Sequence, residues 1–294
     1  MPVDSKLIFF YFVLAAVLVA MTFISCEKDD PVVRDEVADA IPYEITDEIP
    51  DISLNKTSLE LMVGSEETLT YIIKPENATS KEVIWRSSNP AIATVNNGKI
   101  KGISPGEATI TAAVERWIYA TCNVKVIFLT KNIQLNEPGT LKDLISLEEL
   151  PKIGYLSISG PLNGTDIFII REKMTSLVNL DMENARIVSG GMPYYMQQTT
   201  TDNTIGNDMF SQQKTLESII LPKTIKSIGD YAFKGCSNLK SIYIKNPIPI
   251  KIALNTFEGV SKTDCTLFVP TGSFESYWFA FGWSEFQNIK EMDF

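Results

Sequence analysis

The C-terminal half of this 294-residue chain contains a stretch that repeats itself after 23 residues. The segment "TIGNDMFSQQKTLESIIL" (204–221) aligns with "SIGDYAFKGCSNLKSIYI" (227–244), and identical residues include the pair Phe210 and Phe233. A repeat of this length indicates stacked units, because one such unit cannot close a hydrophobic core without its neighbours. The sequence therefore predicts a solenoid in this part of the chain.

Each unit carries the apolar frame L-x-x-I-x-L, whose spaced side chains are expected to point into the core. Two clear copies, two weaker copies and a last strand are Leu216-Ile219-Leu221, Leu239-Ile242-Ile244, Ile153-Leu156-Ile158, Leu177-Leu180-Met182 and Leu267-Val269. Apolar residues at helical spacing in 140–149 predict a helix that caps the first repeat. The stretch 246–265 departs from the pattern, which leaves its local geometry open.

A strand that buries alternate residues presents the residue between them on its other face. In the five frames these outward positions are Ser157, Asp181, Ile220, Tyr243 and Phe268. Since consecutive strands stack, we expect one row across the sheet, polar at its start and apolar at its end. An exposed apolar row is a candidate binding surface, unless a loop or another domain covers it.

Two further groups of aromatic residues are candidates for ligand contact. Tyr194 and Tyr195 lie in the polar stretch 189–203, which is expected to be a long loop where rings could stack on sugars. The other group lies near the C-terminus and is expected to be mostly core, because a terminal cap must bury the last repeat. Its members are Phe274, Tyr277, Trp278, Phe279, Phe281, Trp283 and Phe286.

Residues 52–128 have a different pattern, with short apolar-polar alternations interrupted by turn residues. Strands of this length predict a β-sandwich. Asn97-Gly98 predicts a hairpin with a type I′ turn, and Pro105-Gly106 marks another turn. Trp85 is expected to belong to the core of this sandwich.

Two family resemblances follow from these motifs. "WRSSNPAIATVNNGKIKGISPGEATITA" (85–112) resembles group 2 bacterial immunoglobulin-like domains, and "SIGDYAFKGCSNLKSIYI" (227–244) resembles the BspA-type leucine-rich repeat of bacterial surface proteins. The resemblances imply a mainly β fold: an immunoglobulin-like β-sandwich at 52–128, then a short leucine-rich-repeat solenoid with a helical N-terminal cap at 129–294. They also imply adhesion or spacer roles.

The N-terminus has the layout of a signal peptide, with Lys6 followed by the uncharged, mostly apolar run 7–24. "ISC" resembles the lipobox of bacterial lipoproteins, which implies a signal peptide at 1–25 and lipidation of Cys26; a retained membrane-spanning anchor is the alternative. Lipid chains on Cys26 would tether the protein to the membrane. The acidic patch directly after Cys26 resembles the export signal that sends some bacterial lipoproteins to the outer cell surface, and a plain solubilising spacer is the alternative. The resemblance implies an outer-membrane, lipid-anchored and surface-exposed protein.

Residues 26–51 are expected to form an acidic, disordered tether. The segment 27–51 holds ten acidic and two basic residues, a net charge of −8 out of −10 for the whole chain. Many like charges with few apolar residues favour disorder.

Composition excludes several classes of site. The chain has no histidine, which excludes Ser-His-Asp and Cys-His catalysis and every histidine-ligated metal site. Cys122, Cys236 and Cys265 show no CxxC spacing, so all three are expected to be small buried residues, while a Cys236–Cys265 bridge stays open. We expect no cofactor, no metal, no catalytic residue and no nucleic-acid partner, and we expect a monomer.

The sequence thus predicts a lipid-anchored surface protein that presents its repeat face to a host or community protein or glycan. The alternative is an accessory glycan-binding lipoprotein of an outer-membrane uptake system. A glycosidase with two carboxylates would need no histidine, but no motif places two acids in one pocket.

Overall fold

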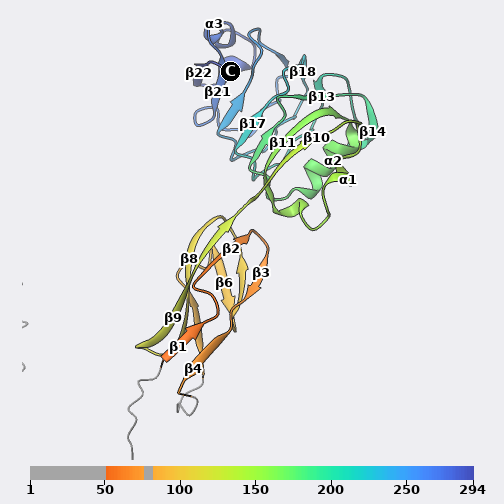
Figure 1. Cartoon of the computed structure of the whole chain (residues 1–294). Coiled ribbons are helices and arrows are strands. Elements are labelled where there is room, and N and C mark those ends of the chain that lie inside the picture. The colour runs from red at the N-terminus through yellow and green to blue at the C-terminus, as the bar shows by residue number, and fades with distance from the viewer. Residues whose placement is uncertain (1–50, 76–81) are drawn as a thin grey trace, which may run out of the picture. The chain divides into compact units, whose positions relative to one another are not determined.

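The computed structural model describes residues 51–75 and 82–294 (Figure 1). The predicted signal peptide, Cys26 and all of the predicted tether except Asp51 lie outside the described residues. Within the described ranges, no helix is long and apolar enough to cross a membrane.

Residues 51–127 form a β-sandwich, as predicted. One sheet has the strand order β2-β9-β8-β5, a second has the order β3-β7-β6, and β1 pairs with β4. The strands are β1 (Asp51–Leu54), β2 (Ser58–Met62), β3 (Glu66–Thr68), β4 (Tyr71–Lys74), β5 (Ile84–Ser87), β6 (Ala93–Asn96), β7 (Lys99–Gly102), β8 (Gly106–Glu115) and β9 (Ile118–Ile127).

Side chains from both sheets meet in one apolar core, with Ile100, Ile110 and Val124 at its centre. Trp85 is half-buried and packs against this core, as expected. Asn97 and Gly98 have φ angles of 48° and 81° between β6 and β7, so the predicted hairpin turn is confirmed.

Residues 129–294 form a solenoid whose main sheet is parallel, in the order β10-β11-β12-β17-β19-β21-β22 (Figure 1). These strands are β10 (Leu129–Gln134), β11 (Ile153–Leu162), β12 (Asn179–Asp181), β17 (Ser218–Ile220), β19 (Ser241–Tyr243), β21 (Thr266–Pro270) and β22 (Asn288–Met292). All residues of the predicted apolar frames are buried, at 2% exposure or less, which confirms the frames.

The sheet extends beyond the frames at both ends. Strand β10 precedes the first frame, and β22 pairs in parallel with β21, which was predicted to be the last strand. Neither strand was predicted, because neither has a complete L-x-x-I-x-L frame.

A second ladder runs along the solenoid, formed by β16 (Thr204–Ile205), β18 (Ser227–Ile228) and β20 (Lys251–Ile252). Strand β20 belongs to the stretch 246–265, which therefore continues the repeat. Phe233 N donates to Thr256 O at 2.9 Å, and Phe257 stacks on Phe233 with ring centroids 5.4 Å apart. The stretch is a repeat unit with slightly longer spacing, which was not predicted from its sequence.

The N-terminal cap differs from the predicted helix. Only α1 (Leu141–Leu144) and the 3-10 turn η1 (Leu150–Lys152) form near 140–149, and Leu147 is 81% exposed. The longer helix is α2 (Gly164–Lys173). The Asn163 side chain accepts from Thr165 N, and the Asp166 side chain accepts from Asn163 N, so a capping box begins this helix.

The remaining strands of the solenoid are short. Strand β13 (Ala185–Ile187) pairs with the end of β11, and β14 (Gly190–Tyr195) pairs with β15 (Gln198–Thr200) in an antiparallel hairpin. The C-terminal segment adds α3 (Phe274–Trp278) and the 3-10 turn η2 (Trp283–Glu285).

The C-terminal aromatic group is only partly core, which corrects the prediction. Tyr277, Trp283 and Phe286 are completely buried. The exposed members, with their exposed fractions, are Phe274 (39%), Trp278 (42%), Phe279 (81%) and Phe281 (66%). Three buried rings are enough to cover the last repeat, and the other rings lie at the surface.

Cys122, Cys236 and Cys265 are buried free thiols, so the Cys236–Cys265 bridge does not form. Cys236 Sγ donates to Phe210 O at 3.1 Å, consistent with a stacking position. Burial raises the pKa of Cys236 and of Cys265 to about 12.

Because these two thiols have raised pKa values, we expect the free energy of unfolding to decrease at alkaline pH. The pKa of a cysteine thiol in the unfolded chain is about 8.5. As the pH rises from this value towards about 12, the unfolded chain releases protons that the folded chain retains, which favours unfolding. Below a pH of about 8.5 the two buried thiols contribute their full stabilisation. Denaturant unfolding at pH 7.5 and pH 9.5 should show the decrease, and a Cys236→Ala/Cys265→Ala variant should show a smaller one. An equal decrease in both proteins would contradict the prediction.

Candidate functional site

The main parallel sheet aligns the five predicted outward residues in one row. Paired positions run from Ser157 to Asp181, then Ile220, Tyr243 and Phe268. The register also adds Asn132 before Ser157 and Lys290 after Phe268. We call these seven residues the outer row. The five predicted members are half-buried, so each reaches the surface while packing on its neighbours.

The apolar part of the outer row is tightly organised. The Tyr243 and Phe268 rings are stacked, with centroids 4.5 Å apart and planes only 6° from parallel. Ile220 is paired with Tyr243 on the neighbouring strand. Aromatic pairs at this distance stabilise each other beyond their buried area.

Charged side chains stand at both ends of this apolar segment. Asp181 accepts from Ser157 Oγ at 3.0 Å and from Glu183 N at 2.9 Å, so its carboxylate is held in place. Lys290 is exposed at the other end. Lys290 was not predicted from the sequence. The signal for it is the alternation in β22, where the buried Ile289 precedes the exposed Lys290.

The outer row has a polar border on the side that precedes it along the strands. The preceding outward positions are mainly hydroxyl and amide residues, namely Tyr155, Asn179, Ser218, Ser241, Thr266 and Asn288. Beyond the row, Lys245 Nζ lies 2.8 Å from Glu183 Oε1 and 4.9 Å from the centre of the Phe294 ring. The apolar segment therefore has a polar margin on the preceding side, whereas the following side contains the Lys245–Glu183 ion pair and the half-buried Pro270 and Met292.

The stretch 189–203 is largely the β14–β15 hairpin, which corrects the prediction of a long loop. Tyr194 is 1% exposed, and its hydroxyl donates to Asn207 O at 2.8 Å. Burial raises its pKa to about 12. Tyr195 is half-buried beneath the Arg171 guanidinium, 4.0 Å from the ring centre. Tyr194 has no surface to offer a ligand, because its ring is buried in the core of the solenoid.

Four exposed rings lie within and just after α3, in an aromatic group that was expected to be mostly core. Phe274 and Trp278 are stacked, with centroids 5.6 Å apart. Phe279 and Phe281 follow directly after α3 and are more exposed than either.

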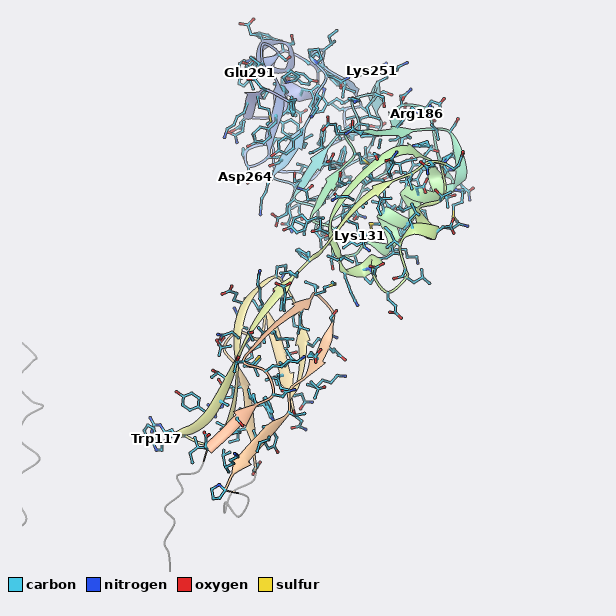
Figure 2. The ribbon with its side chains drawn as sticks, in the orientation of Figure 1. Trp117, Lys131, Arg186, Lys251, Asp264 and Glu291 are labelled. Carbon is cyan, nitrogen blue, oxygen red and sulfur yellow. The ribbon has the colours of Figure 1, made fainter. Side chains whose placement is uncertain are left out.

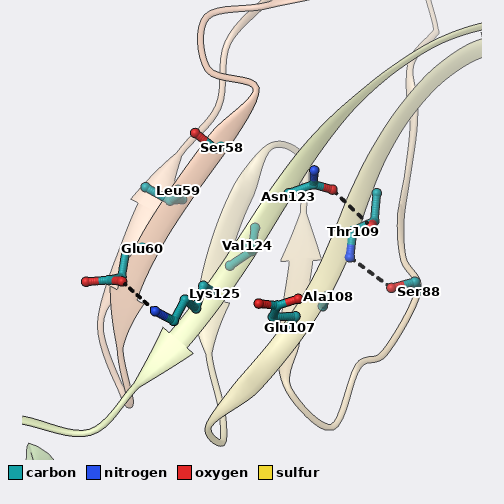
Figure 3. Close-up of a pocket in the computed structure, with 10 residues that line it drawn as sticks. All are labelled: Ser58, Leu59, Glu60, Ser88, Glu107, Ala108, Thr109, Asn123, Val124 and Lys125. Carbon is teal, nitrogen blue, oxygen red and sulfur yellow. Dashed lines mark hydrogen bonds and ion pairs between the residues drawn. The ribbon is translucent and has the colours of Figure 1, made fainter.

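The β-sandwich carries a shallow hollow of about 600 Å³ on its four-stranded sheet (Figure 3). Its lining is mostly polar and already paired: Thr109 N donates to Ser88 Oγ at 2.8 Å, and Lys125 lies 3.3 Å from Glu60. The lining contains no aromatic residue. The exposed Trp117 lies in the turn between β8 and β9 (Figure 2). No site was predicted here from the sequence.

The described residues contain no group of three or more cysteine or carboxylate side chains arranged to hold a metal ion. Their main structural feature is a sheet face with an ordered apolar row. The fold and this face define a modular protein, a β-sandwich followed by a leucine-rich-repeat solenoid.

Comparison with known families identifies both modules. Residues 48–123 match the bacterial Ig-like domain (group 2), and residues 203–293 match the BspA type leucine rich repeat region, in six copies. The chain is therefore a group 2 bacterial Ig-like domain followed by BspA-type leucine-rich repeats, and the predicted fold class is confirmed. These domains are typically non-catalytic binding modules, and the combination fits a cell-surface or adhesion protein.

Similar proteins share only parts of the chain. Two uncharacterized proteins of Clostridium acetobutylicum are 38% and 42% identical over 29% and 26% of this chain, and the matches cover 9% and 20% of those proteins. An Ig-like virion protein of Serratia phage KSP90 is 35% identical over 21% of this chain and 25% of its own length. The chain thus spans a quarter or less of the length of these relatives.

Proposed function

We propose that the protein is a lipid-anchored binding protein of the outer cell surface, and that the outer row contacts its ligand. The observation that carries the proposal is the half-exposed apolar strip of Ile220, Tyr243 and Phe268 across the parallel sheet. An ordered apolar strip at the surface is typical of interaction sites, and sheet faces of repeat arrays commonly bind partners.

The domain types and the N-terminal sequence support this proposal. Ig-like and BspA-type repeat domains fit a surface or adhesion protein. The apolar run 7–24 and the lipobox-like "ISC" at Cys26 support a lipid anchor, and the acidic segment after it supports a tether.

The test is binding of the full-length protein, purified in mild detergent, to arrays of extracellular proteins and polysaccharides. A Tyr243→Ala/Phe268→Ala variant should lose at least about tenfold in affinity for the ligand, because central aromatic contacts dominate binding energy. Circular dichroism verifies that the variant is folded. Unchanged binding by a folded variant would contradict a role for the outer row.

A second candidate is an accessory glycan-binding lipoprotein of an uptake system. The exposure of Trp278, Phe279 and Phe281 favours it, because sugars pack their C–H faces against accessible ring faces. A Phe279→Ala/Phe281→Ala variant should then lose polysaccharide binding while the Tyr243→Ala/Phe268→Ala variant retains it. The opposite pattern would contradict this candidate.

A further inference from the structure

The orientation of the rings in the outer row restricts the chemistry of its ligand. Neighbouring strands lie about 4.7–4.9 Å apart. The Tyr243 and Phe268 ring centres are separated by nearly the same distance, 4.5 Å, and their planes are almost parallel. The rings therefore stack in the direction from strand to strand, so that each stands on edge and turns its rim outward.

Rings that stand on edge are poor platforms for sugars. A sugar needs an open ring face, but Tyr243 and Phe268 cover each other, and Ile220 and Lys290 hold the next positions on either side. A ridge of ring edges and an isoleucine instead suits aliphatic side chains, which pack without a flat contact. The strip thus favours a polypeptide ligand over a glycan.

The distance between the charged residues Asp181 and Lys290 matches the length of a short extended polypeptide. Asp181 and Lys290 are separated by four strand spacings, about 19 Å. An extended chain covers about 20 Å in six residue steps of roughly 3.3 Å, with alternate side chains on one face. Positions 1, 3, 5 and 7 of such a chain would all face the outer row.

We propose that the outer row binds an extended polypeptide segment that crosses the strands, with the pattern basic-x-apolar-x-apolar-x-acidic. The basic side chain pairs with Asp181, the two apolar side chains cover Ile220, Tyr243 and Phe268, and the acidic side chain pairs with Lys290. The segment lies on the sheet without joining it, because its chain runs across the strands. This inference rests on the proposed function and specifies its ligand.

Three blocked, labelled peptides test the charge pattern against the full-length protein by fluorescence anisotropy: Lys-Thr-Leu-Thr-Leu-Thr-Glu, and versions with Lys or with Glu at both ends. The wild-type protein should prefer the mixed-charge peptide by about three- to fivefold, the typical effect of one exposed ion pair. Lys290→Glu should shift the preference to the peptide with two lysines. The control Lys251→Glu changes an exposed lysine on β20, which belongs to the other ladder, and should leave the preference unchanged.

The outcomes distinguish the outer row as the binding site from a polypeptide as its ligand. Equal binding of all three peptides by wild-type protein and by Lys290→Glu would overturn the charge pattern. A polysaccharide that binds through Tyr243 and Phe268, with no peptide binding, would overturn the polypeptide ligand and retain the outer row as the site. Peptide binding that survives Tyr243→Ala/Phe268→Ala would overturn both.

Discussion

Replacing Gly160 by alanine is expected to cost at least about 3 kcal/mol of unfolding free energy, because a positive φ and a backbone clash act together. Gly160 has φ of +89°, and a Cβ atom there would lie about 2 Å from Leu135 O, a backbone atom on the neighbouring chain segment. The residue stands where β11 changes its pairing from β12 to β13, so a local shift would disturb both ladders. Denaturant unfolding of the full-length protein, followed by circular dichroism, measures the loss.

Gly272→Ala is the matched control for this prediction. Gly272 has a similar φ of +84°, but nothing lies within 4 Å of the position of its Cβ atom. Its substitution should cost only the conformational penalty of about 1–2 kcal/mol. If both alanine variants lose the same stability, the close approach of Leu135 to Gly160 has no energetic role.

Truncating Phe233 to alanine should destabilise the solenoid by about 3–5 kcal/mol, the range for a buried phenylalanine. Phe233 is completely buried between Phe210 and Phe257, at centroid distances of 5.7 and 5.4 Å. Its removal would leave a cavity in the middle of the stack and remove two aromatic contacts. The loss is measured as the change in denaturation midpoint at an unchanged slope.

Phe279→Ala removes the same side chain from a surface position that is 81% exposed. Its effect on stability should stay within about 0.5 kcal/mol. A loss of several kcal/mol at Phe279 would show that this ring packs against another part of the protein, and a small loss at Phe233 would contradict the stacked core.

Much of the candidate site was predictable from the repeat. The period places equivalent residues on neighbouring strands, and the alternation of a strand assigns each residue to one face. For this reason Ser157, Asp181, Ile220, Tyr243 and Phe268 were found as one row before the structure was known. Lys290 was not predicted, because β22 lacks the full L-x-x-I-x-L frame. The pairing of β22 with β21 places Lys290 next to Phe268, at the end of the outer row.

The aromatic residues outside the repeat show the limit of this reasoning. Tyr194 was expected in a surface loop and is buried. The C-terminal aromatic group was expected to be mostly core, but Phe279 and Phe281 are exposed. Local sequence shows that such residues are apolar and says nothing about which segments cover them. The hairpin packs on α2 and buries Tyr194, and the last repeat needs only Tyr277, Trp283 and Phe286 to close its end.

Features that depend on the sequence alone therefore differ physically from features that depend on the tertiary structure. Repeat period, inward frames, hairpin turn and outward row depend on spacing along the chain, so the amino-acid sequence is sufficient to predict them. Burial of individual rings, the close approach of Gly160 to Leu135 and the edge-on stacking of Tyr243 and Phe268 depend on contacts between distant segments. Such contacts exist only once the solenoid has formed, because the volume available to each side chain is set by its neighbours in space.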